Sequence, residues 1–167
     1  MKKFIAPLLL LPSLAFAHTN SVDFPIQAKC DSDNQVVNLS FRVTNLSNYR
    51  TTFKINFVGD SGTSQKTSVG IVNGNSTSYS SMTEDTVTSI YANSTITVQA
   101  QYIHNYTGSN SRGKNTCSLL PVMANIMHMD TNSQILVTGY TYSTDSLTSS
   151  ADPKFQFDFN INNGKPF

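Results

Sequence analysis

The sequence has no tryptophan, only two cysteines and few charged residues. Charged residues make up 13% of the chain, the formal net charge is +1, and the basic residues are scattered. Such a distribution forms neither the basic patch of a nucleic-acid-binding protein nor the polybasic segment that binds an anionic membrane surface. The lack of tryptophan also excludes the Cys–Trp–Cys core of antibody-type immunoglobulin domains. No nucleic-acid partner is therefore expected.

Long apolar runs are equally scarce, and the one that is present lies at the N-terminus. Lys2 and Lys3 precede the apolar residues 4–14, and Ala15-Phe16-Ala17 has the small-x-small pattern of a cleavage site. Together these features predict a secretory signal peptide over residues 1–17. A spanning helix would need about 20 apolar residues without internal prolines, so no integral membrane segment is expected after cleavage. We predict export through the inner membrane of a bacterium and a periplasmic or extracellular location.

Cys30 and Cys117 are the only cysteines. They form no Cys-x-x-Cys motif and have no neighbouring histidine, which argues against a redox-active pair or a metal site. In an oxidising compartment, a lone pair of cysteines most simply forms one disulfide. We therefore predict a Cys30–Cys117 bond between the early and the later part of the exported chain.

Alternation of apolar and polar residues is what the sequence has in abundance. Phe155, Phe157, Phe159 and Ile161 are separated by single polar residues, and the same period of two recurs along the chain. This period is typical of strands with one buried and one solvated face. Strands are predicted over residues 26–30, 37–44, 53–57, 67–72, 75–80, 87–91, 95–103, 135–142 and 155–161.

Strands of this kind, joined mostly by short turns, predict an all-β fold. We expect a two-layer antiparallel β-sandwich of Ig-like architecture, with eight to nine strands in a single domain over residues 18–167. The pair Asn73-Gly74 predicts a two-residue type I′ hairpin turn. Residues 118–129 fit either a strand that continues from Cys117 or a short helix, and we favour the strand.

The three histidines are candidate metal ligands. After cleavage His18 would be the first residue, and its imidazole and free α-amine together suit Cu(II). In this respect it resembles the histidine brace of lytic polysaccharide monooxygenases and of some small periplasmic copper carriers. The resemblance implies a second histidine on the β-sandwich, which here is His104 or His128. Copper binding is kept as an alternative, and otherwise no cofactor is expected.

A catalytic constellation is not evident in the sequence. There is no Gly-x-Ser-x-Gly motif, and His128 with Asp130 is the best pair of base and orienting acid. Residues two apart near a turn seldom form such a pair. We therefore do not predict an enzyme.

A fimbrial subunit is a second alternative. The chain resembles chaperone-assembled pilins, which are exported all-β proteins of about this size, rich in Thr and Asn and usually with one disulfide. The resemblance implies that the segment before Cys30 acts as a donor strand for another subunit.

The main functional hypothesis is recognition of a protein or glycan partner by a loop. Residues 105–116 combine Tyr106, Arg112 and Lys114 with Gly, Ser and Asn, a mixture that is common in binding loops. Loops carry recognition when a rigid sandwich presents them. The sequence thus predicts an exported, non-enzymatic binding module whose partner is contacted by this loop.

Overall fold

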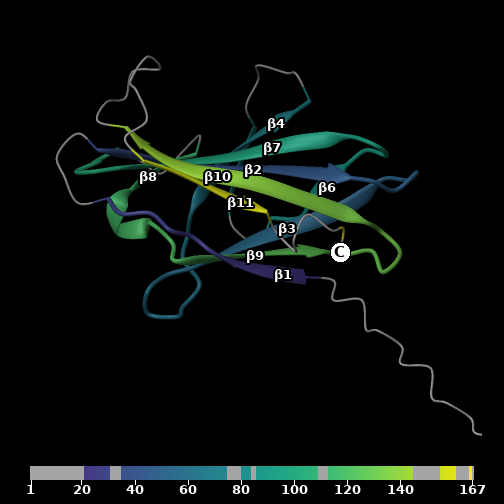
Figure 1. Ribbon diagram of the computed structural model, residues 1–167, viewed down its shortest axis with the longest axis horizontal. Helices are drawn as coiled ribbons and strands as arrows, with labels where there is room; N and C mark the ends of the chain where they lie inside the picture. The colour runs from purple at the N-terminus through teal and green to yellow at the C-terminus, as the bar shows by residue number, and fades with distance from the viewer. Residues whose placement is uncertain are drawn as a thin grey trace, which may run out of the picture.

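The computed structural model describes residues 21–30, 35–74, 80–83, 86–108, 113–144, 155–160 and 166. Over these residues the chain forms two antiparallel β-sheets that pack against each other (Figure 1), which confirms the predicted all-β sandwich. The predicted signal peptide and His18 lie outside the described residues. None of the described residues belongs to a helix that is long and apolar enough to cross a membrane.

The larger sheet has seven strands in the order β11–β10–β2–β7–β4–β5, with β8 paired to β7 beside this path. The pairs are antiparallel except for β7–β8, which is parallel. At its centre, the register of β2 and β7 places Val36 opposite Ile103 and Thr44 opposite Thr95. The strands are β2 (Val36–Asn45), β4 (Ser68–Asn73), β5 (Ser80–Thr83), β7 (Thr95–Ile103), β8 (Lys114–Thr116), β10 (Ile135–Thr144) and β11 (Phe155–Asn160).

The smaller sheet has four strands in the order β1–β9–β3–β6 and forms the second layer in Figure 1. Its strands are β1 (Ser21–Pro25), β3 (Thr51–Val58), β6 (Thr88–Ile90) and β9 (Met123–His128). Over the described residues the two sheets hold eleven strands, of which β6 and β8 have three residues each. The strand predicted over 87–91 corresponds to β6, and the predicted eight to nine strands did not count β8 and β9. We call the end where β2 leads into β3 the β2–β3 end, and the opposite end the disulfide end.

The core between the sheets is built from the apolar residues of the alternating pattern. Phe41 of β2 contacts Phe24 of β1 edge-to-face, with ring centroids 5.0 Å apart, and its centroid lies 6.4 Å from that of Phe57 in β3. These contacts join the two layers, and each large apolar side chain that is fully buried stabilises the fold by about 1.5–3 kcal/mol. The alternation predicted for β7 is confirmed by its buried residues Ile96, Val98, Ala100 and Tyr102.

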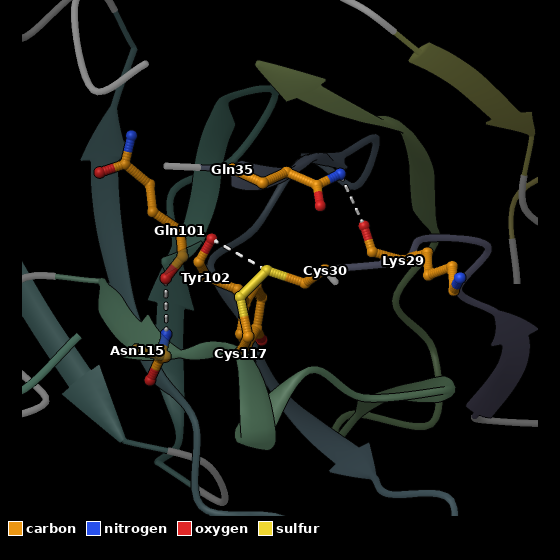
Figure 2. Close-up of a disulfide and its surroundings, with 7 residues drawn as sticks. All are labelled: Lys29, Cys30, Gln35, Gln101, Tyr102, Asn115 and Cys117. Atoms are coloured by element: carbon orange, nitrogen blue, oxygen red, sulfur yellow. Dashed lines mark hydrogen bonds between the residues drawn. A yellow bond between two sulfur atoms is a disulfide. The ribbon is translucent and has the colours of Figure 1, made fainter. Parts of the chain in front are cut away.

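The predicted disulfide between Cys30 and Cys117 is present, with the two Cα atoms 5.7 Å apart. Figure 2 shows the bond beside β7, where the Cys30 sulfur lies 3.8 Å from the Tyr102 carbonyl oxygen. The Tyr102 side chain is fully buried, and its hydroxyl lies 3.5 Å from the Thr67 hydroxyl oxygen. Burial raises the pKa of this phenol, and the Thr67 contact lowers it by a smaller amount.

One strand boundary and one turn differ from the sequence predictions. The first strand is β1, residues Ser21–Pro25, whereas residues 26–30, predicted as a strand, have no regular structure. The two-residue turn at Asn73-Gly74 is also wrong, because β4 and β5 pair with Ile71 opposite Ser80 and only Gly74 has a positive φ, of 54°. A type I′ turn needs positive φ at both central residues, and this connection is longer. The predicted strand over 75–80 is described only from Ser80 onward.

The segment after Cys117 contains parts of both alternatives. Residues Cys117–Leu119 form a single 3-10 turn, η1, and the strand β9 begins only at Met123. A strand continuing directly from Cys117 is therefore wrong, although the strand itself is confirmed. The donor-strand segment of the fimbrial alternative supplies β1, which pairs with β9 of its own chain. The fimbrial role itself stays a prediction.

The strand β8 lies inside the segment predicted as a loop, and its Asn115 side chain hydrogen-bonds to the neighbouring strand β4. The Asn115 carboxamide accepts a hydrogen bond from the Ser68 backbone N–H at 2.8 Å and donates one to the Ser68 carbonyl at 2.9 Å. Asn115 is fully buried, and Nδ2 also lies 3.4 Å from the Gln101 carbonyl oxygen (Figure 2). The side chain thus stands in for a backbone partner where β4 begins.

Candidate functional site

The predicted binding loop is described in part. Tyr106 is half-buried directly after β7, and its backbone N–H donates to the Ile103 carbonyl at 3.3 Å. Lys114 is exposed on β8, in register with Gln101 of β7. Arg112 lies outside the described residues. Both described residues belong to the disulfide end, and the loop's role in binding stays a prediction.

The two internal histidines lie at opposite ends of the sandwich. His104 follows β7 at the disulfide end, and its backbone N–H donates to the Gln35 carbonyl at 3.2 Å. His128 ends β9 at the β2–β3 end, opposite Phe53. His104 and His128 therefore cannot both ligate one ion. A site that joins either of them to His18 stays a prediction, because His18 lies outside the described residues. Within the described residues, no three His, Cys, Asp or Glu side chains gather closely enough to hold a metal.

His128 and Asp130 form a structural network. His128 is only 2% exposed, and its Nδ1 lies 2.8 Å from both the Ser133 hydroxyl and the Asp130 carbonyl oxygen. The Asp130 carboxylate turns to the start of β3 instead, where it accepts bonds from the Thr51 hydroxyl at 2.7 Å and the Thr52 N–H at 3.0 Å. These bonds, led by that from Thr51, lower the pKa of Asp130. The imidazole Nδ1 thus lies against the Asp130 backbone carbonyl, while the Asp130 carboxylate bonds to β3.

A polar pocket lies at the β2–β3 end, on the outer face of the larger sheet. Its volume is about 340 Å³, within the range of small-molecule sites. The floor comes from β2 and β7, where Arg42 stands opposite Thr97, and the turn after β6 forms one wall. This Tyr91 pocket, as we name it, is lined by Arg42, Asn73, Gly74, Tyr91, Ser94, Thr95, Ile96 and Thr97.

The buried Asn45 side chain fixes the turn that carries Tyr91. Its Nδ2 donates to the carbonyl oxygens of Tyr91 at 3.1 Å and Tyr49 at 2.7 Å, while its Oδ1 accepts from the Ser47 N–H at 2.9 Å. The Ser94 hydroxyl also donates to the Tyr91 carbonyl, at 2.8 Å. One fully buried amide therefore couples two loops at this end, which pre-organises the wall of the pocket.

The opposite wall is tied to the floor by backbone contacts. The Gly74 N–H donates to the Thr95 carbonyl at 3.1 Å, and the hydroxyls of Thr95 and Thr44 lie 2.8 Å apart. Gly74 has φ of 54°, a left-handed conformation that glycine adopts without strain. Both walls are thus held by hydrogen bonds to the two central strands.

Tyr91 and Arg42 give the pocket its recognition chemistry. Tyr91 is 71% exposed, the largest exposed fraction among the exposed apolar and aromatic side chains of the described residues. The Arg50 guanidinium lies 5.3 Å from its ring centroid, a cation–π contact that restrains a side chain otherwise open to solvent. Arg42 is exposed, and no carboxylate of the described residues forms an ion pair with it. The lining therefore combines an aromatic ring, a cation and several hydroxyl and amide groups.

Sequence patterns alone did not identify this pocket. Arg42 is the polar member of an alternating strand, which is the ordinary pattern of a solvated face. Tyr91 ends a predicted strand, and Asn73 belongs to a predicted tight turn. The nearest signals were the turn-forming residues Asn93 and Ser94, which mark a loop and carry no information on its neighbours.

A second pocket, of about 360 Å³, lies at the disulfide end. The Thr141 hydroxyl donates to the Gln27 carbonyl at 3.2 Å and closes its floor. The pocket is lined by Gln27, Ala28, Lys29, Gln35, Val37, Thr141, Tyr142 and Ser143.

No protein-family model, curated protein or solved structure matches this chain. An all-β sandwich does not specify a function by itself, because unrelated activities occur on the same architecture. The function is therefore inferred from the geometry and chemistry of the Tyr91 pocket.

Proposed function

We propose that the protein is an exported, non-enzymatic binding module for a protein or glycan partner, and that the partner is held at the Tyr91 pocket. The observation that carries this proposal is that the exposed Tyr91 ring, in the turn after β6, lines the same pocket as the exposed Arg42 of β2. Tyrosine and arginine are, together with tryptophan, the residue types most often found to dominate binding energy.

Pre-organisation supports a binding role for this end of the molecule. The Asn45 amide and the Gly74 N–H fix both walls before any ligand arrives. A ligand that enters a rigid site does not have to order it, so more of the contact energy appears as affinity. Ser133 and His128 at the same end hydrogen-bond to each other and to the Asp130 backbone, which supports a structural role for them.

The test compares two sets of variants for retention of partners. The processed protein is immobilised and exposed to a glycan array and to envelope and host extracts. Tyr91→Ala combined with Arg42→Gln should weaken retention of the partner at least about tenfold, because each removes a principal contact. The matched control is Tyr106→Ala combined with Lys114→Gln, which changes an aromatic and a cation at the disulfide end.

Three results would decide the matter. Loss in the Tyr91/Arg42 variant alone supports the proposal, provided that its circular dichroism and melting temperature match those of the wild type. Loss in the Tyr106/Lys114 variant alone would move the site to the originally predicted loop. A folded protein that retains no partner from either source would contradict the binding function.

Export is supported by the Cys30–Cys117 disulfide, because such bonds persist in oxidising compartments. We expect expression in a bacterium to yield a processed chain that begins at His18 in the periplasm or the medium. Cell fractionation followed by mass spectrometry of the intact protein measures both features. A cytoplasmic, unprocessed chain with free thiols would contradict export.

A further inference from the structure

We infer that the ligand class of the Tyr91 pocket is a saccharide that carries a carboxylate. This inference rests on the proposed binding function and names the chemistry of the ligand. Three observations carry it: an exposed aromatic ring, an arginine without a described acidic neighbour, and a floor of internal strands that offers side-chain hydroxyls.

The aromatic ring suits the apolar face of a sugar. An aromatic face carries partial negative charge, and the C–H groups on one face of a pyranose carry partial positive charge, so the two stack. Tyr91 lines the pocket and keeps most of its surface exposed, while Arg50 restrains it through the cation–π contact. A volume of about 340 Å³ lies within the range of small-molecule pockets.

Arg42 supplies the charge preference. Among the described residues of the lining it is the only charged one, and none of them is an aspartate or glutamate. A guanidinium forms two parallel hydrogen bonds with a carboxylate, an arrangement that is both stronger and more directional than a neutral contact. A neutral sugar has no opposite charge to pair with the guanidinium, so the pocket favours an acidic one.

The floor of the pocket favours a saccharide over a peptide. An extended peptide is usually held by pairing with an exposed strand edge. The floor strand β7 already pairs with β2 on one side and with β4 on the other, so its backbone groups are engaged. A ligand can therefore hydrogen-bond only to side chains here, such as the Thr97 hydroxyl and the exposed Asn73 amide. Both groups donate and accept hydrogen bonds, as sugar hydroxyls do.

The experiment titrates the ¹⁵N-labelled processed protein with defined probes. The carboxylated probes are oligogalacturonate, sialyllactose and a hyaluronan hexasaccharide, and the neutral probes are maltohexaose and lactose. A poly-glutamate peptide provides the same charge without a sugar. We expect at least one carboxylated probe to shift the amide signals of Tyr91 and Thr97, and its affinity to exceed that of its neutral counterpart about tenfold.

Variants assign the effect to residues. Arg42→Gln should remove the preference for the carboxylated over the neutral probe, whereas Tyr91→Ala should weaken both. Lys114→Gln, which removes an exposed cation at the disulfide end, should change neither. Raising the salt concentration should weaken the binding of the carboxylated probe but not that of the neutral probe, because salt screens charge pairs near the surface.

The outcomes separate this inference from the proposed function. Equal binding of neutral and carboxylated sugars at the pocket would overturn the acidic class and leave the binding function intact. Binding of poly-glutamate with no sugar bound would overturn the saccharide class and point to an acidic protein partner. If no probe shifts any signal, the inference fails, and the proposed function is then decided by the array and extract experiment alone.

Discussion

Gly113 shows how a single residue constrains the path of the chain beside β7. It has φ of 77°, and an added Cβ would lie 2.9 Å from both the Gln99 carbonyl oxygen and the Gly70 nitrogen. Gly62 has nearly the same φ, 76°, but open space around its Cβ position. We expect Gly62→Ala to cost about 1 kcal/mol from backbone strain alone, and Gly113→Ala about 3 kcal/mol because a backbone clash is added.

Chemical denaturation of both glycine variants measures this difference. The Gly62 variant is the matched control for the left-handed conformation. Equal losses of unfolding free energy in the two variants would show that the backbone atoms around Gly113 give way.

Asp130 is expected to make stability depend on pH in the acid range. The pKa of Asp130 in the folded protein lies below the ordinary value. The main cause is the hydrogen bond that the carboxylate accepts from the Thr51 hydroxyl, and the second is the bond from the Thr52 N–H. In the unfolded chain the Asp130 carboxyl group titrates at about pH 3.9. The stabilisation that its hydrogen bonds provide is therefore present above that pH and disappears as the pH falls through the pKa of the folded state. An asparagine at this position does not titrate, so Asp130→Asn should reduce the change of the unfolding free energy with pH below about pH 4.

Thr51→Val tests the cause of this pKa shift. The substitution keeps the shape of a fully buried residue and removes the hydroxyl donor, so the acid dependence should weaken without disappearing. Urea denaturation at a series of pH values compares the two variants with the wild type. If the Asp130→Asn profile keeps the wild-type slope, other groups account for the acid dependence.

At the scale of elements, β8 depends on one side chain. Asn115 bonds both backbone groups of Ser68 where β4 begins, and both residues are buried. Asn115→Ala would leave these groups buried without partners, at about 1–3 kcal/mol each. We therefore expect a loss of about 2–4 kcal/mol in unfolding free energy and faster hydrogen exchange at Ser68.

The exposed Asn48 provides the control for this substitution. It lies in the loop after β2, and Asn48→Ala should stay within about 0.5 kcal/mol of the wild type. Similar small losses in both variants would mean that water replaces the Asn115 amide.

The elements differ in how far sequence patterns could predict them. β7 alternates over nine residues, and its buried face was predicted correctly from Ile96 to Tyr102. β8 is the sequence Lys-Asn-Thr, which contains no apolar residue, so its pairing with β7 left no periodic signal. The 3-10 turn η1 was also missed as a separate element, because a three-residue turn is too short for a period to appear.

At the scale of the whole molecule, the disulfide connects the segment after β1 to the start of η1. It spans 87 residues of sequence, and closing such a loop stabilises the fold by up to about 4–5 kcal/mol in the chain-entropy account. Reduction, or Cys30→Ser with Cys117→Ser, should therefore lower the unfolding free energy by several kcal/mol. Denaturation with and without reductant measures this change.

The double serine variant is the control for the reductant itself, which should not change its stability. Segment 26–30 keeps other contacts, including the Ile26 N–H to Val122 carbonyl bond of 2.8 Å, so the reduced protein should retain its sheets. Equal stability of the oxidised and reduced forms would contradict the loop-closure account.

The sequence by itself determined the all-β class, the pairing of the only two cysteines and the buried face of the longer strands. The strands and their buried faces are local properties, since a period of two places alternate side chains on one face whatever the strand's neighbours are. The disulfide follows from the presence of two cysteines, which leaves one possible intramolecular pair. For the function, it supplied a loop and three histidines as candidates, and their roles remain predictions.

Only the tertiary structure decided which strands pair and in what register. It placed Arg42 opposite Thr97 and brought Tyr91, from the turn after β6 of the other sheet, to the same pocket. It also separated His104 from His128. The physical reason is that alternation fixes the face on which a side chain lies but carries no information about the distant segment across from it, which is selected by packing of the whole core.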